Sequence, residues 1–140
     1  MEKIDREKIC PLLLRCFWKQ DRNNTIQDYK NAAHGILPSN EIQIYTWPDA
    51  TFREITDLLK DVIVPNQTKQ RNSHFEISLV YPDRNGNYKI RSIARVRLNR
   101  EGNDDEKCLA DIKFETGDYL DIAIVSQGSS PRFVNDRNVF

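Results

Sequence analysis

Apolar and polar residues alternate along several short stretches of the chain. A period of two is typical of strands that bury one face against a core. Between two of these stretches, Asn85-Gly86 favours a tight hairpin, because such turns need the positive backbone angles that Gly readily adopts. The stretches predicted to be strands are 11–18, 41–46, 74–81, 88–98 and 119–125.

Residues 51–62 carry apolar side chains at the spacing of a helix instead. Thr51 and Glu54 fit a capping box, in which the hydroxyl and the carboxylate satisfy free backbone amides of the first turn. Pro65 is expected to stop the helix. The stripe that should pack on a sheet consists of Phe52, Ile55, Leu58, Leu59 and Val62.

The predicted order is strand, strand, helix, strand, strand, strand. It fits an α+β, ubiquitin-like β-grasp fold, in which one main helix packs on one face of a mixed sheet and the first and last strands are central neighbours. We expect this domain to span residues 1–126, with a long polar loop insertion near 19–40 that carries one helical turn. Residues 127–140 lack apolar periodicity and are expected to form a flexible tail.

Composition excludes several classes of function. The 140 residues include 21 Lys and Arg and 21 Asp and Glu, so no net charge draws the protein to nucleic acid or anionic lipid. The three cysteines form no close pair, which argues against a zinc site or a secreted disulfide framework. The chain shows no apolar signal segment and no run near the roughly 18 apolar residues that a membrane span needs. We expect an intracellular protein with no membrane contact.

No catalytic or nucleotide-binding motif occurs in the chain: a nucleophile elbow, a phosphate-binding loop, a zinc-protease helix and a dinucleotide fingerprint are all missing from the sequence. The two histidines, His34 and His74, have no partner at ligand spacing. We therefore expect a protein that is not an enzyme, with no catalytic residue, no cofactor and no metal.

Three stretches in the predicted strands carry recognisable motifs. They are CPLLLR at 10–15, the segment 41–47 followed by Asp49-Ala50-Thr51, and GDYLDIAI at 117–124. Together, in this order, they resemble the Sin-three-associated polypeptide family, and the resemblance covers most of residues 4–125. The sequence departs from the family pattern at Pro48, in the Arg-rich fourth strand and in the acidic loop after it, which leaves the exact partner open.

The resemblance implies a ubiquitin-like fold and an adaptor role without chemistry. It also implies that the chain is the eighteen-kilodalton subunit of two kinds of nuclear complex. One is the Sin-three histone deacetylase corepressor, and the other is the apoptosis-and-splicing-associated complex, which accompanies the exon junction complex on messenger RNA. In the second, the implied partners are an Acinus-like or pinin-like protein and an RNA-binding protein with a serine-rich domain. The expected location is the nucleus, with the cytoplasm also open.

Alternation leaves large apolar residues, together with Arg15 and Asp121, on the sheet face opposite the helix. An adaptor must act through a surface, so this outer face is the candidate partner-binding site. One interpretation is that an extended partner segment lies there, with a strand added at an open edge. The other is that the insertion near 19–40 covers the face as a satellite core. The candidate residues are Leu13, Phe17, Tyr45, Tyr119 and Val125.

The fourth predicted strand supplies a second candidate surface. Arg91, Arg95 and Arg97 occupy odd positions and are expected to project together, where they could contact phosphates of a nucleic acid. This suggests an alternative function, a direct RNA-binding module. Such modules interleave basic residues with stacking aromatics, whereas here the basic strand and the aromatic strands are separate. We therefore favour the adaptor and expect RNA contact to be weak or indirect.

Overall fold

The computed structural model describes residues 4–63 and 73–126. The predicted tail at 127–140 and the predicted helix stop at Pro65 lie outside these ranges. A single turn of helix and a 3₁₀ turn lie in the insertion, close to the predicted helical turn. The elements are β1 Leu12–Gln20, α1 Ile26–Tyr29, η1 Ala32–His34, β2 Glu41–Thr46, α2 Phe52–Val62, β3 Ser73–Pro82, β4 Tyr88–Arg97, η2 Leu109–Ile112 and β5 Tyr119–Ser126.

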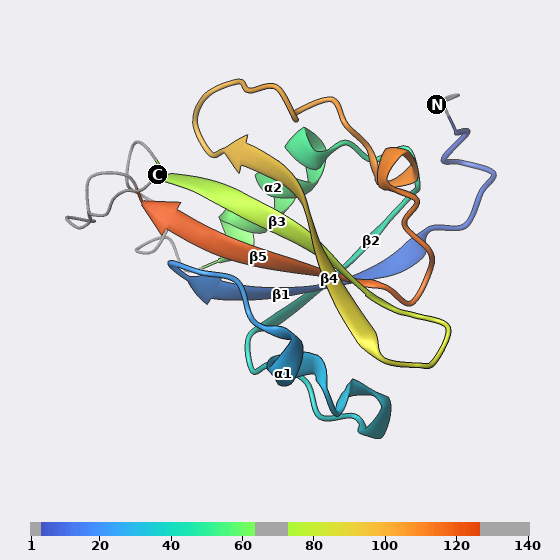
Figure 1. Ribbon diagram of the computed structural model, residues 1–140. Helices are drawn as coiled ribbons and strands as arrows, with labels where there is room; N and C mark the ends of the chain where they lie inside the picture. The colour runs from blue at the N-terminus through green and yellow to red at the C-terminus, as the bar shows by residue number, and fades with distance from the viewer. Residues whose placement is uncertain (1–3, 64–72, 127–140) are drawn as a thin grey trace.

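The strands form one open, mixed sheet in the order β2-β1-β5-β3-β4. β1 and β5 are parallel neighbours at its centre, and the other three pairs are antiparallel. α2 packs on one face of the sheet, and α1 lies on the opposite side (Figure 1). The predicted α+β ubiquitin-like fold is confirmed, including the central pairing of the first and last strands.

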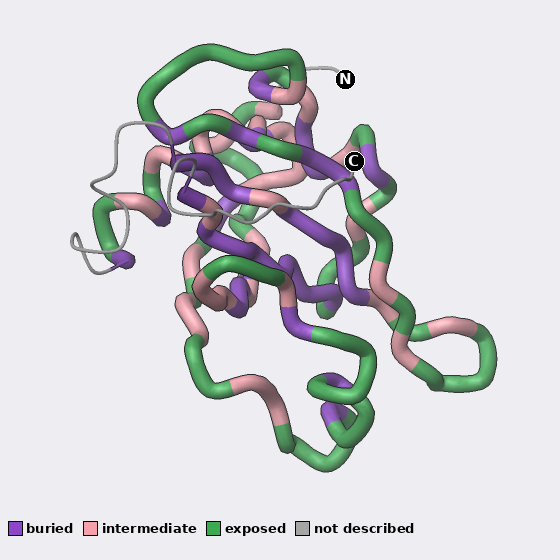
Figure 2. The backbone as a smooth tube through the Cα atoms, turned by 60° about the vertical axis from the view of Figure 1, so that its left-hand side comes forward, coloured by how far each residue is buried: buried purple, intermediate pink, exposed green. Residues whose placement is uncertain are grey.

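The main core lies between α2 and the sheet. Buried residues concentrate along the strands, whereas much of the insertion and the β3–β4 turn are exposed (Figure 2). Phe52, Ile55 and Leu59 of α2 are fully buried, as predicted. Leu58 and Val62 were wrongly assigned to the buried stripe: they are 46% and 60% exposed, because they lie at its borders, where the sheet does not reach.

One half of the predicted capping box is present at the start of α2. The Thr51 hydroxyl accepts the backbone N–H of Glu54 at 3.1 Å. The other half was predicted wrongly, because the Glu54 carboxylate pairs with the Arg6 guanidinium at 2.8 Å instead of the cap. Arg6 also pairs with Asp49 at 2.9 Å, so one guanidinium holds the N-terminal segment against the start of the helix.

A β-bulge interrupts β4. Ile77 of β3 pairs with Ala94, and the next residue, Ser78, pairs with Ser92, so Ile93 is an extra residue with no partner of its own. Each residue inserted into a strand exchanges the faces of all residues beyond it. Even-numbered residues before the bulge and even-numbered residues after it therefore point to opposite faces of the sheet. The same holds for odd-numbered residues.

The outer edge of the second half of β4 is occupied by side chains. Asp104 accepts the backbone N–H of Arg95 at 2.9 Å, and the Lys107 ammonium donates to the carbonyl of Ile93 at 3.0 Å. The Arg53 guanidinium donates to the carbonyl of Arg97. The charged loop after β4 and a side chain of α2 thus satisfy backbone groups that a further strand would need.

Candidate partner-binding site

The outer face of the sheet carries the residues that alternation predicts for it. Leu12, Leu14 and Ile122 pack in the main core on the α2 side. The intervening residues of these strands point to the outer face, where Phe17 and Tyr119 pack in a second, smaller apolar cluster. The alternation therefore holds along β1, β2 and β5.

The insertion covers the middle of this outer face. Tyr29 of α1 packs edge-on against Phe17, with ring centroids 5.7 Å apart, and stacks on Tyr119 at 6.0 Å. Phe17 is 0% exposed and Tyr119 is 7% exposed. Of the two alternatives that the sequence left open, the satellite core holds for these two residues, which a partner cannot reach in this conformation. Other residues of this cluster are Ala32, Leu37, Val80, Tyr88 and Ile90.

A buried carboxylate anchors the insertion to the sheet. Asp121 of β5 is fully buried and accepts the backbone N–H of Asn24 at 2.9 Å, the Asn24 side-chain amide at 2.8 Å, the Asn23 amide at 3.0 Å and the Tyr29 hydroxyl. Burying a charge is costly unless donors replace its water, and these four donors do so. Burial and the adjacent Asp121 charge raise the pKa of Tyr29, which keeps its hydroxyl a donor.

Arg15 closes the cluster on the β2 side. Its guanidinium lies over the rings of Phe17 and Tyr119, 5.7 and 5.4 Å from their centroids. It also donates two hydrogen bonds to Glu41, one of them at 3.0 Å. These bonds hold the pKa of Glu41 below its ordinary value of 4.5. A planar cation thus forms one wall of an otherwise apolar cluster.

Beyond Arg15, the outer face is open. Leu13 pairs with Tyr45 across β1 and β2, so their side chains are neighbours. Tyr45 is 69% exposed, and Leu13 is half-buried. We call Leu13 and Tyr45 the Tyr45 patch. At the end of β2, the Trp47 indole donates to the Ile9 carbonyl at 2.7 Å, which holds the exposed Ile9 at this end of the sheet.

The edge of the sheet beside the Tyr45 patch is unpaired among the described residues, since β2 is the last strand in the order. The backbone N–H of Trp18 donates to Asn40. In an antiparallel pair hydrogen bonding alternates from residue to residue, so Glu41, Gln43 and Tyr45 direct their backbone groups away from β1. The Tyr45 patch therefore adjoins a row of available donors and acceptors.

Val125 is not part of this patch. It is half-buried and pairs with His74 near the other end of β5. Tyr119, which pairs with Arg15, lies six residues earlier, a distance of about 20 Å along a strand. The structure therefore divides the five candidate residues into three groups: the Tyr45 patch, the covered pair Phe17 and Tyr119, and Val125, which lies apart from both.

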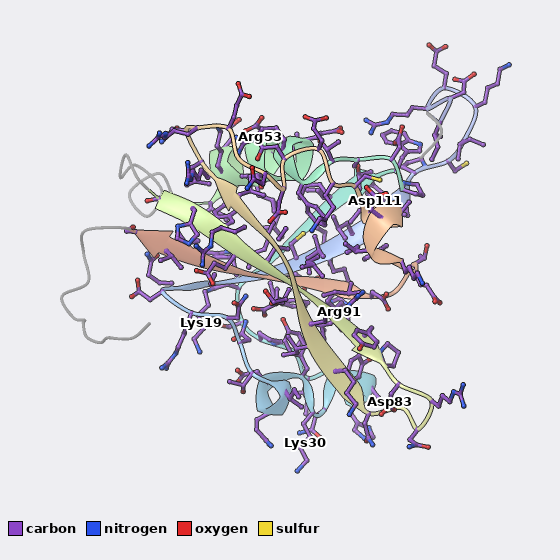
Figure 3. All side chains as sticks on the ribbon, turned by 45° about the horizontal axis from the view of Figure 1, so that its top comes forward. Lys19, Lys30, Arg53, Asp83, Arg91 and Asp111 are labelled. Atoms are coloured by element: carbon purple, nitrogen blue, oxygen red, sulfur yellow. The ribbon has the colours of Figure 1, made fainter. Side chains whose placement is uncertain are left out.

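The three candidate arginines do not share a face. Arg91 lies on the α2 side and donates to the carbonyl of Ile112 at 2.8 Å (Figure 3). Arg95 pairs with Glu76 on the outer face at 3.4 Å, and Arg97 is exposed there. The expectation that they project together is wrong, because the bulge at Ile93 exchanges the faces between Arg91 and Arg95.

Comparison with known proteins decides the family. The profile of the family described as Sin3 associated polypeptide p18 (SAP18) matches residues 3–124. The chain belongs to the SAP18 family. It is 46% identical over 125 residues to the histone deacetylase complex subunit SAP18 of Arabidopsis thaliana, covering 88% of this chain and 80% of that protein. It is 40% identical over 130 residues to the Homo sapiens protein of the same name, covering 91% and 82%.

The SAP18-family motifs seen in the sequence lie on adjacent elements. CPLLLR leads into β1, the segment from Glu41 to Thr51 spans β2 and the cap of α2, and GDYLDIAI leads into and occupies most of β5. β2, β1 and β5 are consecutive in the sheet. The three motifs therefore lie in one continuous half of the domain, the half that carries the Tyr45 patch and the open edge.

Asp121 and Arg15 have roles in this SAP18-family chain that the sequence did not reveal. Alternation placed both on the outer face, but it did not show the Arg15 contacts with the Phe17 and Tyr119 rings or the Asp121 contacts with the insertion. An acidic residue within an apolar central strand is a signal of a buried polar contact, and Asn23-Asn24 offered the donors. The sequence could not show that these segments, about 100 positions apart, meet.

Two further findings concern the described parts of this SAP18-family chain. Within residues 4–63 and 73–126, no group of three or more His, Cys, Asp or Glu side chains could hold a metal ion. No helix in the same ranges is long and apolar enough to cross a membrane.

Proposed function

We propose that this chain is a non-enzymatic adaptor subunit of a nuclear histone deacetylase corepressor complex of the Sin3 type. Its support is membership of the SAP18 family and the relatives' names as histone deacetylase complex subunits. A subunit of this kind acts by binding proteins, so it needs a surface that a partner can reach.

The observation that carries the binding mode is the open edge of β2 beside the exposed Tyr45. An extended partner segment adds to β2 as a sixth strand, and its backbone pairs with the outward groups of Glu41, Gln43 and Tyr45. One apolar side chain of the segment rests on the Tyr45 patch. Main-chain pairing supplies much of the affinity, and the aromatic contact supplies register and selectivity.

The proposal extends to messenger RNA processing. Family resemblance implies that the segment belongs to an Acinus-like or pinin-like protein, assembled with an RNA-binding protein that has a serine-rich domain. In this assembly the chain links corepression to splicing and to the exon junction complex, and it reaches RNA through its partners. Its site of action is the nucleus, with a cytoplasmic pool as a further element of the proposal.

Gln43 provides the sharpest test of strand addition. Its backbone N–H points away from β1, so Gln43→Pro removes a donor to the partner without removing a bond to β1. Affinity for an Acinus-like or pinin-like segment, measured by calorimetry, should fall at least tenfold. The matched control Gln43→Ala should bind like the wild type. If Gln43→Pro keeps its fold and its affinity, strand addition at β2 is refuted.

Substitutions on the outer face test the patch. Truncating an aromatic anchor costs about 2 kcal/mol, so Tyr45→Ala should weaken the same binding roughly 30-fold with little change in melting temperature. Phe17→Ala should lower the melting temperature and leave the affinity nearly unchanged, because Phe17 is buried under the insertion. Retained affinity in Tyr45→Ala would exclude the Tyr45 patch as the binding site. The adaptor role would then be tested separately, by whether the chain associates with deacetylase activity in nuclear extract.

A further inference from the structure

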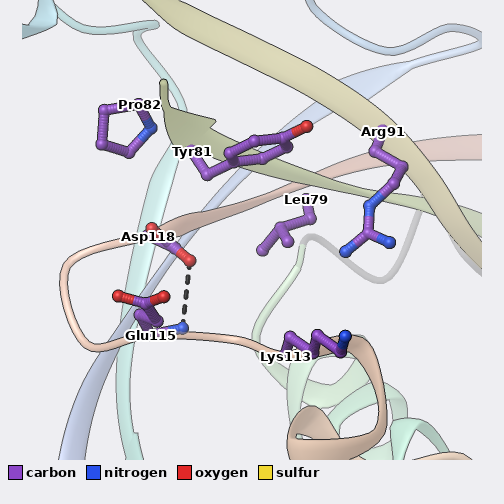
Figure 4. Close-up of a pocket in the computed structure, with 7 residues that line it drawn as sticks. All are labelled: Leu79, Tyr81, Pro82, Arg91, Lys113, Glu115 and Asp118. Carbon is purple, nitrogen blue, oxygen red and sulfur yellow. Dashed lines mark hydrogen bonds between the residues drawn. The ribbon is translucent and has the colours of Figure 1, made fainter. Parts of the chain in front are cut away.

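A pocket lies on the α2 side of the sheet, away from the Tyr45 patch. Its volume is about 330 Å³, within the range of roughly 300–1,000 Å³ typical of ligand pockets. It lies between the base of the β3–β4 hairpin and residues 113–118, which connect η2 to β5 (Figure 4).

Two cations without an acidic partner mark one end of this pocket. Arg91 donates from one guanidinium nitrogen to the Ile112 carbonyl at 2.8 Å, which fixes its position and leaves its other donors available. Lys113 follows Ile112, in a left-handed backbone conformation with φ of 62°. Across residues 4–63 and 73–126, no carboxylate forms an ion pair with either side chain.

Two carboxylates mark the other end, as Figure 4 shows. Asp118 is only 8% exposed and accepts the backbone N–H of Glu115 at 3.0 Å. Neither Asp118 nor Glu115 is in an ion pair with any described cation. Burial and the nearby Glu115 charge raise the pKa of Asp118, so a cation placed beside it would offset an existing cost.

Apolar surface connects the two ends. Leu79 forms a buried floor, and the ring of the half-buried Tyr81 forms a wall. The bulge at Ile93 matters here as well, because it keeps Arg91 on the same side of the sheet as Leu79, with which it pairs. The pocket is therefore charged with opposite signs at its ends and apolar between them.

We propose that this pocket binds a mixed-charge peptide segment of a protein partner. A basic side chain of the segment faces Asp118 and Glu115, an acidic side chain faces Arg91 and Lys113, and the chain between them crosses Leu79 and Tyr81. Charge complementarity selects this ligand. The carboxylates would repel a nucleic acid or an all-acidic segment, and the two cations would repel an all-basic segment.

The site is independent of the proposed strand addition. The Tyr45 patch lies on the outer face at the β2 edge, whereas the pocket opens on the α2 side between β3, β4 and the η2–β5 segment. One chain can therefore hold two partner segments at once. Loss of one interaction leaves the other measurable.

The test uses short blocked peptides and the full chain labelled with nitrogen-15. The probes carry one Arg and one Glu separated by zero, one or two glycines, in both orders, and the comparison peptides carry two Arg or two Glu. At least one mixed-charge peptide should shift the amide signals of Leu79, Tyr81 and residues 113–118. It should bind at least tenfold more tightly than either comparison peptide.

Variants locate the interaction. Lys113→Gln and Asp118→Asn should each weaken the mixed-charge peptide at least fivefold, and the Asn side chain can still accept the N–H of Glu115. The controls Lys30→Gln and Asp61→Asn change exposed charges elsewhere and should bind like the wild type. If Asp118→Asn does not fold, Lys113→Gln carries the test. Absence of shifts at millimolar peptide, equal binding of the two-Arg or two-Glu peptide, or unchanged affinity in Lys113→Gln would overturn the proposal.

Discussion

Asp121 fixes the position of the insertion through four hydrogen bonds from neutral donors. A charged residue in this place has no apolar substitute, because the same donors would then be left buried and unpaired. The insertion therefore lies over Phe17 and Tyr119 for a polar reason as well as an apolar one. As a result, Phe17 and Tyr119, which the sequence indicated as candidate partner anchors, are buried.

Tyr29→Phe tests this anchor with the smallest possible change. The ring stays in place against Phe17, and only the hydroxyl that donates to Asp121 is lost. Loss of a hydrogen bond to a buried charge should lower the free energy of unfolding by about 1–3 kcal/mol in urea denaturation. Tyr45→Phe, which removes an exposed hydroxyl, is the matched control and should change stability little. Equal effects in the two variants would contradict the anchor.

The Arg15–Glu41 pair predicts a pH dependence. The folded-state pKa of Glu41 lies below 4.5, so the pair stabilises the fold above that pH and loses its contribution as the pH falls through the lowered value. The wild type should therefore be more stable than Glu41→Gln at pH 7, and the difference should shrink below pH 4.5. Urea denaturation of both proteins over this range measures it. A difference that does not change with pH would show that the charge is not its cause.

At the scale of elements, the sequence pattern predicted each of the strands found in residues 4–63 and 73–126. The helix Phe52–Val62 and its Thr51 cap also followed from local sequence. The bulge at Ile93 could not be predicted from local sequence, because Ile93 and Ala94 are both small or apolar enough to be buried on either face. The insertion was recognised as a loop, but its contact with β5 depends on partners distant in sequence. Local pattern determined the elements, and long-range pairing determined which candidate residues remained exposed.

The insertion itself can be tested by replacement. It connects β1 to β2, which are antiparallel neighbours that a short turn between Trp18 and Asn40 could join. A chain with residues 21–39 replaced by Asn-Gly should retain the sheet by circular dichroism, because the main core lies on the other face. It should unfold at lower urea and bind an apolar dye at the exposed Phe17 and Tyr119. Unchanged stability would show that the satellite core contributes nothing.

At the scale of the molecule, charge predicts weak contact with RNA. The net charge is zero, and the bulge places Arg91 on the face opposite Arg95 and Arg97. The few phosphate contacts that remain should give a low affinity that falls further as salt rises. Fluorescence anisotropy with single-stranded RNA at 50 and 200 mM salt measures this. Sequence-selective binding that persists at the higher salt would support the RNA-binding alternative instead.

The two edges of the sheet differ, and the difference limits how the molecule can polymerise. Side chains from Asp104, Lys107 and Arg53 already occupy backbone groups along the second half of β4, whereas β2 has none of its outward groups paired among the described residues. In the language of polymer chemistry, the chain is a monomer with one open reactive end and one that is blocked along half of its length. Blocking the second half of β4 opposes edge-to-edge growth of the sheet, so strand addition at β2 favours a discrete complex over a fibre.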